Sequence, residues 1–314
     1  MRTIILILLL ALLPVSGSQA ASVDVYTGEA VVTGKEAGER RRALPLALEN
    51  ALQKLSGLRS FDDYPQVKPA LADASSILLS FHYRVVESVL ADGSQQDELR
   101  LVAKFSASRV DELARYLELP LWETERAATD VWVVVDDGLD RRILPVEYSY
   151  AWDAMSEAAA WRGLPVSWPQ ADEDGLYAVD EQLLWGGYTE DLGAGEDRGV
   201  MIAAARREGL EWNVRGNLTY RGQTWTWRIE DINLQAALTE NMQQAADWIA
   251  AANTIAATDL GNWVQELTVL GLNDAEDYSR CLSYLQGLSV VDHVAVVSAR
   301  AGEVTLRLSL SALP

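Results

Sequence analysis

Residues 131–138 read Val-Trp-Val-Val-Val-Asp-Asp-Gly, an unbroken apolar run that ends in a polar turn. A strand with one solvated face alternates apolar and polar residues, whereas a strand covered on both faces can be apolar throughout. A predicted helix follows, with Ala151, Met155 and Ala158 on one apolar stripe. A buried strand followed by such a helix indicates layers of strands and helices. The sequence therefore predicts an α/β (α+β) fold of small mixed sheets covered by helices.

This strand opens a central α/β unit, which we expect to span residues 128–258. Within it, Asn213 and Arg215 stand in a hairpin where apolar strand residues are expected. The hairpin has its loop at Arg221-Gly222, a short connection typical of paired antiparallel strands. The predicted elements after the first helix are a short extended piece, two helices, the hairpin and a last helix, at 164–166, 181–185, 198–208, 211–233 and 239–257.

A smaller unit is expected on each side of the central one. Residues 21–120 show the order β-α-β-β-α, and Ser108 and Asp111 are spaced as an N-cap and its capping-box partner. Residues 259–314 show the order β-α-β-β. Because no Pro- or Ser-rich linker separates the units, we expect two or three units packed together. The predicted elements of the first unit are a strand, a long helix, two β-runs and a second helix, at 23–32, 36–55, 79–86, 99–105 and 108–119.

The first twenty residues, 1–20, have the layout of a cleaved secretory signal. Arg2 precedes the apolar run Ile4–Leu13, and Ser18-Gln19-Ala20 supplies the small residues that a signal peptidase reads. The run is too short to span a bilayer, and no second long apolar run provides a transmembrane anchor. The single cysteine, Cys281, lies far from the cleavage site, so it cannot carry a lipid there. The sequence predicts a soluble protein of the periplasm that is not a lipoprotein.

The overall charge and the scarcity of metal-binding residues limit the possible functions. The net charge of −20 repels nucleic acid, which we do not expect as a partner. With one cysteine, the exported chain has no internal disulfide and no His/Cys metal site. The two histidines, His82 and His293, each lie inside a β-run. No phosphate-binding or dinucleotide-binding glycine motif occurs, so we expect neither a metal nor a cofactor.

Three carboxylates at the end of the buried strand are candidates for a functional site. Asp136, Asp137 and Asp140 follow Val135, at the position where α/β domains commonly place functional groups. Their oxygens could bind a divalent cation. The alternative is that Asp-Asp-Gly is turn chemistry, and the spacing does not match a calcium loop.

The chain has 11 tryptophans and only 3 phenylalanines, which suggests aromatic binding surfaces. Trp185, Trp225 and Trp227 are the candidates, and exposed indoles of this kind bind sugars. However, Trp225 and Trp227 share one face of a strand with Ile229, and the opposite face is polar. That alternation is the pattern of a strand that buries its aromatic face in the core, and it favours this alternative for most of the tryptophans.

Three segments, 131–144, 158–187 and 214–227, together resemble the exported Gram-negative family of domain of unknown function 2066, over most of the mature length. Because that family has no assigned activity, the resemblance implies no catalytic residues. The central unit is also similar to the α/β domains at the front of envelope assembly proteins of the TolB and curli-secretion types. Those domains serve packing and contacts with partners.

Taken together, these features favour a non-enzymatic periplasmic protein that binds other envelope proteins. A module that binds peptidoglycan or another glycan is the alternative, on the basis of the tryptophans. A metal-dependent hydrolase that uses Asp136, Asp137 and Asp140 is the third hypothesis.

Overall fold

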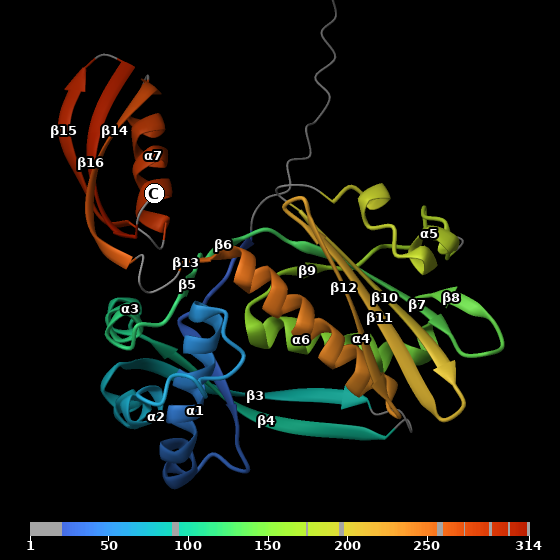
Figure 1. Ribbon diagram of the computed structural model, residues 1–314. Coiled ribbons are helices and arrows are strands. Elements are labelled where there is room, and N and C mark those ends of the chain that lie inside the picture. The colour runs from blue at the N-terminus through green and yellow to red at the C-terminus, as the bar shows by residue number, and fades with distance from the viewer. Residues whose placement is uncertain are drawn as a thin grey trace, which may run out of the picture.

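The computed structural model describes residues 21–89, 94–173, 175–194, 198–255, 260–272, 274–288, 291–300 and 302–312 (Figure 1). The predicted signal, residues 1–20, lies outside this part of the chain. The expected α/β fold of small mixed sheets covered by helices is confirmed. Within the described ranges, no helix is long and apolar enough to cross a membrane.

The N-terminal sheet has the strand order β2-β4-β3, and helix α1 packs on one of its faces. The apolar residues of α1 recur every three to four positions and are buried, which places Leu48, Leu52 and Leu55 in the core. Gly57 ends the helix with a φ of 71° and donates its N–H to Gln53. The elements are β2 (Thr27–Val31), α1 (Ala37–Ser56), α2 (Val67–Ala70), η1 (Leu71–Ser76), β3 (Leu78–Val89), β4 (Gln95–Phe105) and α3 (Ala107–Tyr116).

The central sheet has six strands in the order β12-β11-β10-β7-β8, with β9 also paired to β7. Helices α4 and α6 cover one face, and the short helix α5 lies on the other (Figure 1). The strands are β7 (Thr129–Asp136), β8 (Arg141–Ile143), β9 (Val166–Ser167), β10 (Gly199–Glu208), β11 (Glu211–Tyr220) and β12 (Gln223–Asp231). The helices are η2 (Val146–Tyr148), α4 (Ser149–Arg162), α5 (Glu181–Gly186), η3 (Glu190–Leu192) and α6 (Leu234–Asn253).

The apolar run that predicts the fold lies near the middle of this sheet as β7. Val131, Val133 and Val135 face the helices α4 and α6, whereas Val134 packs against Leu184 of α5 on the opposite face. Both faces of β7 are therefore covered, which is the physical reason for its continuous apolar sequence.

The prediction of a helix over 198–208 is wrong, because this segment is strand β10. Its alanines, Ala203 to Ala205, are good helix formers on their own. However, β10 pairs in parallel with β7 and antiparallel with β11, so it lies inside the sheet with Ala203 and Ala205 fully buried. The pairing on both sides overrides local propensity. The polar Asn213 and Arg215 are likewise accommodated in β11, with regular pairing to β12.

Two helix starts also differ from the prediction. The N-cap of α3 is Ser106 rather than Ser108, so the capping box with Asp111 does not form. Helix α6 begins at Leu234, five residues earlier than predicted, because the side chain of Asn233 accepts the backbone N–H groups of Gln235 and Ala236.

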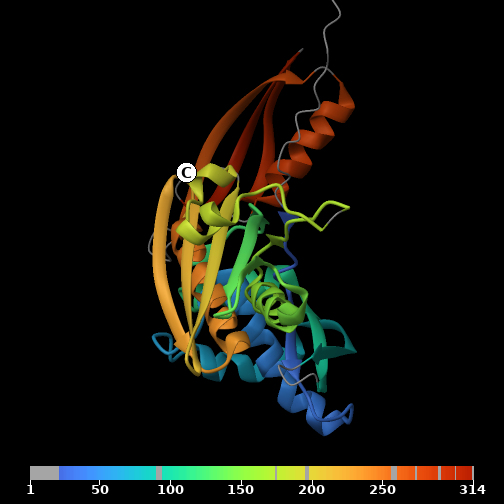
Figure 2. The same cartoon turned by 90° about the vertical axis from the view of Figure 1, so that its right-hand side faces the viewer.

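The C-terminal residues form a small sheet of order β14-β16-β15 with helix α7 on one face (Figures 1 and 2). This unit has its own core, which includes Leu285, Leu306 and Leu308. Cys281 is half-buried on α7, packs against that core and is a free thiol. The elements are β14 (Leu260–Leu272), α7 (Ala275–Gly287), β15 (Val291–Arg300) and β16 (Gly302–Ala312).

Two short strand pairs and two buried arginines join the N-terminal and central units. Arg126 is 3% exposed and donates to the carbonyl oxygens of Glu123, Lys54 and Gly163 at 2.8, 2.6 and 2.6 Å. Burial, and then the nearby Arg162, lowers the pKa of the Arg126 guanidinium to about 9. The strand pairs are β1 (Ala21–Ser22) with β6 (Glu125–Arg126) and β5 (Leu121–Trp122) with β13 (Thr254–Ile255).

Arg162 is the second buried arginine of this junction, at the end of α4, and it is 2% exposed. It donates to the carbonyl oxygen of Gly57 at 2.8 Å and to the carboxylate of Asp247 at 2.7 Å. One side chain thus satisfies the C-terminal end of α1 and a carboxylate of α6, so three helices are fixed relative to one another.

Tyr26, just before β2, gives the fold a predicted dependence on alkaline pH. Its hydroxyl donates to the carboxylate of Asp111 in α3 at 3.0 Å. Burial, and then the negative charge of Asp111, raises the pKa of the Tyr26 phenol above its ordinary value. Above about pH 10 the unfolded chain therefore loses a proton that the folded chain keeps, so stability falls as the pH rises.

The test compares midpoints of urea unfolding at about pH 9 and about pH 11, on either side of the ordinary tyrosine pKa. We expect the midpoint to fall between the two values in the natural chain, and to fall less in Tyr26→Phe. Equal decreases in both proteins would contradict this prediction.

Candidate functional site

The three predicted carboxylates lie in the turn between β7 and β8. Asp136 accepts the backbone N–H of Gly138 at 3.1 Å, and its other oxygen lies 3.6 Å from Arg141 and 3.5 Å from Arg206. Its charge is therefore shared between two guanidinium groups from neighbouring strands.

Asp137 and Asp140 are also engaged in the turn. One Asp137 oxygen accepts the backbone N–H groups of Leu139 and Asp140, and these bonds are the main reason that the pKa of Asp137 is lowered. The guanidinium of Arg142 lies 3.4 Å from Asp137 and 3.0 Å from Asp140. Backbone amides of the turn and arginine side chains thus already bind the carboxylate oxygens that a divalent cation would need. Among the described residues there is no cluster of three or more potential metal ligands.

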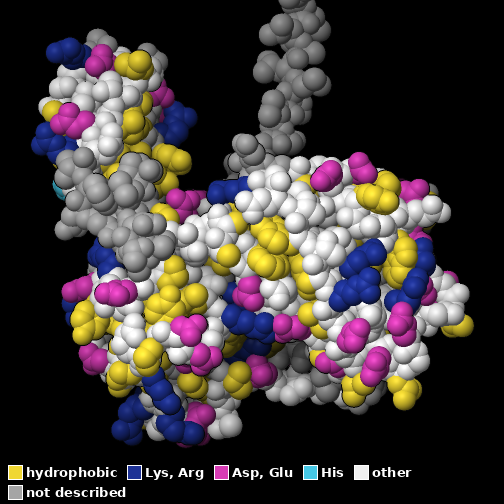
Figure 3. Space-filling model, viewed as in Figure 1, with side chains coloured by type: hydrophobic (Ala, Val, Ile, Leu, Met, Phe, Trp, Pro, Cys, Tyr) yellow, Lys and Arg dark blue, Asp and Glu magenta, His cyan; other side chains and the backbone are white. Residues whose placement is uncertain are grey.

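Trp185 on α5 contacts the same two arginines as Asp136. The sequence does not indicate this proximity. The Arg141 guanidinium lies 4.0 Å from the centroid of the indole, and that of Arg206 lies 4.9 Å from it. Both distances are in the range of cation–π contacts. Basic side chains gather over this end of the sheet in Figure 3.

Trp225 and Trp227 lie on the opposite face of the sheet, so the three predicted tryptophans do not form one surface. Trp225 stacks on Trp248 of α6, with ring centroids 5.8 Å apart. Trp227 occupies the space above Gly216, where a Cβ atom would lie 2.2 Å from the indole. Both rings are half-buried against the central core, which matches the alternative that the sequence left open.

A larger hollow lies elsewhere, between the β3–β4 hairpin and helices α4 and α6, and we call it the interunit hollow. Its volume is about 600 Å³. None of the six predicted site residues lines it. The polar and aromatic side chains around it comprise four carboxylates, one arginine, amides, hydroxyls and aromatic rings: Glu87, Gln96, Glu98, Arg100, Tyr150, Asp153, Ser156, Glu157, Trp161, Gln235, Thr239 and Gln243.

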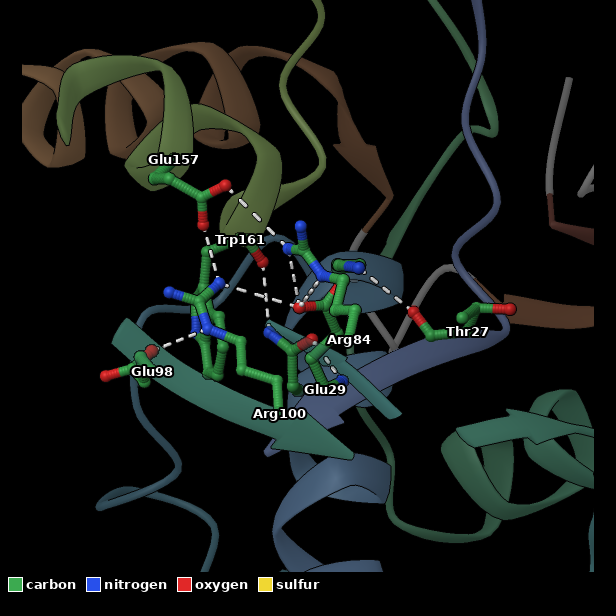
Figure 4. A network of polar contacts seen from close by, with 9 residues as sticks. Thr27, Glu29, Arg84, Glu98, Arg100, Glu157 and Trp161 are labelled. Atoms are coloured by element: carbon green, nitrogen blue, oxygen red, sulfur yellow. Dashed lines mark hydrogen bonds and ion pairs between the residues drawn. The ribbon is translucent and has the colours of Figure 1, made fainter. Parts of the chain in front are cut away.

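A network of ion pairs forms one wall of the interunit hollow (Figure 4). Arg100 of β4 binds Glu98 at 2.6 Å and Glu157 of α4 at 2.5 Å. Arg84 of β3 binds Glu29 at 2.8 Å and lies 3.7 Å from Glu157. The network therefore connects the N-terminal sheet to the first helix of the central unit.

The other charges that line the interunit hollow are acidic. Glu87 and Asp153 are exposed and lie outside the network of Figure 4, so the open part of the hollow has an excess of negative charge. Tyr150 and Trp161 add aromatic rings, and burial raises the pKa of the Tyr150 phenol. The lining contains neither histidine nor cysteine, and Glu157 and Glu98 are held by arginine.

Sequence reasoning missed the interunit hollow because its lining comes from distant segments. Trp161 follows Ala158 by three residues and so continues the predicted apolar stripe, yet it is half-buried and lines the hollow. The sequence of α4 does contain a signal for this surface, because Asp153, Ser156 and Glu157 form a polar stripe along one side of the helix.

A domain of unknown function, DUF8605, matches residues 20–123 by its family model. The matched segment covers the N-terminal sheet with its helices and ends just after β5. The match agrees with the expectation of a family of unknown function, but it does not confirm the resemblance to domain of unknown function 2066 or to TolB-type domains. No curated protein matches the chain.

Two solved structures show remote similarity. A ribosomal subunit interface protein from Coxiella burnetii is 10% identical, with a TM-score of 0.22, over 39% of this chain and 96% of its own. An uncharacterized protein is 12% identical, with a TM-score of 0.16, over 40% of this chain and 91% of its own. At these TM-scores neither similarity bears on the fold or the function.

Proposed function

We propose that this chain is a non-enzymatic protein of the bacterial envelope that binds a basic segment of another envelope protein in the interunit hollow. The expected secretory signal over residues 1–20 supports the compartment. The resemblance to the exported family of domain of unknown function 2066 also supports the compartment, and the resemblance of the central unit to TolB-type and curli-secretion domains supports a role in contacts with partners.

The observation that carries the proposal is the charge of the interunit hollow. Its arginine, Arg100, is already neutralised by Glu98 and Glu157, whereas Glu87 and Asp153 are exposed lining residues that pair with no arginine or lysine among the described residues. A segment with lysine or arginine would complement these carboxylates, which favours encounter and specificity. Tyr150 and Trp161 offer apolar contact area, as aromatic side chains do at protein interfaces.

Glycan binding remains the second candidate, and one observation favours it. The interunit hollow combines Trp161 and Tyr150 with the planar amides of Gln96, Gln235 and Gln243. Aromatic faces and hydrogen-bonding amides are groups that sugars can use. The predicted tryptophans, by contrast, are occupied by arginines or by packing in the core.

The test is photo-crosslinking in cells from a light-activated residue at position 235, followed by mass spectrometry. We expect one reproducible envelope protein, and we expect its yield to fall roughly tenfold in the charge-reversed variant Glu87→Lys/Asp153→Lys. The matched control Asp63→Lys/Glu112→Lys makes the same change in net charge on exposed residues outside the hollow, and it should keep the crosslink.

Recovery of no reproducible protein, or an unchanged yield in Glu87→Lys/Asp153→Lys, would contradict protein binding. Pelleting of the purified protein with peptidoglycan separates the two candidates. If pelleting occurs and is lost in Trp161→Leu, while no protein crosslinks from position 235, the glycan candidate replaces the proposal.

A further inference from the structure

A second, smaller cavity lies on the other side of the molecule, on the face of the central sheet that carries α5. Its volume is about 110 Å³. Three of its lining residues are arginines from three adjacent strands, Arg206 of β10, Arg215 of β11 and Arg228 of β12, and we call it the arginine cavity. The remaining lining residues are Trp185, Ala204, Glu208 and Asn213.

Two of these arginines face each other directly across the β-ladder. Arg215 and Arg228 are register partners in the pairing of β11 with β12. Like charges directly opposite each other destabilise a sheet, because their side chains start only about 5 Å apart. Arg206 adds a third positive charge on the same face, beside Asn213, its own partner on β11. A chain with a net charge of −20 thus gathers positive charge at one point.

Arg215, the middle arginine of the three, is held in place by neutral groups. Arg215 donates to the side-chain oxygen of Asn217 at 3.2 Å and to the backbone carbonyl of Trp185. Burial, and then the charges of Arg228 and Arg206, lowers the pKa of Arg215. Arg228 is exposed and makes no ion pair with any residue that the structure describes.

The charges that line the arginine cavity therefore add up to an excess of two positive charges, from three arginines and Glu208. Arg206 is partly balanced by Asp136, 3.5 Å away, but Asp136 also lies near Arg141. The indole of Trp185 lines the cavity and contacts the guanidinium groups of both Arg141 and Arg206. The free protein keeps a repulsion between arginines that a bound anion would relieve.

We propose that the arginine cavity binds a phosphate dianion, either inorganic phosphate or the phosphate of a small monoester. Guanidinium groups bind phosphate oxygens with paired hydrogen bonds, and a phosphate monoester carries close to two negative charges at neutral pH. The volume accommodates a single tetrahedral oxyanion, so the organic part of a monoester would lie outside the cavity. This site is separate from the interunit hollow, so it does not depend on the proposed function.

The test measures the thermal unfolding temperature of the purified full chain in about 20 mM phosphate and in sodium chloride of equal ionic strength. For a ligand present well above its dissociation constant, we expect phosphate to raise the midpoint by about 2–4 °C. The increase should disappear in Arg228→Gln and in Arg215→Gln. The control Arg207→Gln, from the opposite face of β10, should keep it.

A second readout separates a binding arginine from a structural one. Without phosphate, Arg228→Gln should unfold at the same or a higher temperature than the natural chain, because the repulsion with Arg215 is removed. A structural arginine would instead lower that temperature. Glycerol phosphate used in place of inorganic phosphate distinguishes the two sources: an equal or larger shift indicates a monoester, and a smaller one indicates free phosphate.

Two results would overturn the proposal. One is a midpoint for the natural chain that is the same in phosphate and in chloride. The other is an increase that survives in Arg228→Gln or that is lost equally in Arg207→Gln, since either pattern indicates a general salt effect.

Discussion

Replacement of Arg126 by methionine is expected to lower the free energy of unfolding by about 3 kcal/mol. The guanidinium donates to the backbone carbonyls of Glu123, Lys54 and Gly163, which belong to both the N-terminal and the central unit. It also lies 3.7 Å from the centroid of Trp122. Methionine fills a similar volume but leaves buried carbonyl oxygens without a donor, and each costs on the order of 1 kcal/mol or more.

Urea unfolding followed by tryptophan fluorescence measures this loss, because Trp122 is buried beside Arg126. The matched control is Arg109→Met, which removes an exposed arginine whose pair with Glu112 lies on the surface of α3. Surface pairs contribute about 0–1 kcal/mol, so the control should unfold almost as the natural chain does. If Arg126→Met is as stable as this control, then the buried arginine does not hold the two units together.

The second large effect is expected from Gly28→Ala in β2. A Cβ atom built at Gly28 would lie 1.8 Å from the backbone carbonyl oxygen of Ala47, in the middle of α1. The clash is with the backbone of a helix, so no side-chain rotation can relieve it, and β2 would have to move away from α1. We expect a loss of about 3 kcal/mol, at the upper end of the range for overpacked cores.

Gly38→Ala, in helix α1, is a control for which the expected change in stability has the opposite sign. Gly38 lies in the first turn of α1, is exposed, and has no atom within 4 Å of its Cβ position. Alanine there should stabilise the chain by about 0.5–1 kcal/mol, because glycine has the poorer helix propensity. Both variants are measured by urea unfolding. A stable Gly28→Ala would mean that β2 does not lie directly on the backbone of α1.

Elements with a strong periodic pattern were predictable from the sequence. The apolar run of β7, the spacing in α1 and the two-residue loop at Arg221-Gly222 each correspond to one arrangement of the backbone. Both loop residues have positive φ, 47° and 71°, as a tight hairpin requires. Strand β10 was not predictable in this way, because its alanines are compatible with a helix and its strand pairing involves β7, far away in the sequence.

The two cavities illustrate the same limit. The interunit hollow unites β3, β4, α4 and α6, and no local pattern brings such segments together. The pairing of Arg215 with Arg228, by contrast, follows from the sequence. The loop at Arg221-Gly222 fixes the register of the hairpin and places these two residues opposite each other. The sequence therefore contained this like-charge pair, whereas the position of Arg206 beside it depended on the unexpected strand β10.

The pairing of β5 with β13 has a consequence for the time course of folding. It joins Leu121–Trp122 to Thr254–Ile255. This contact between the N-terminal and central units can therefore form only after the whole central unit has been synthesised. Contacts between residues so distant in the sequence slow folding, since a long loop must be ordered before they form. Until then the apolar surface around Trp122 stays open to contact with other chains, and such exposure favours aggregation during folding.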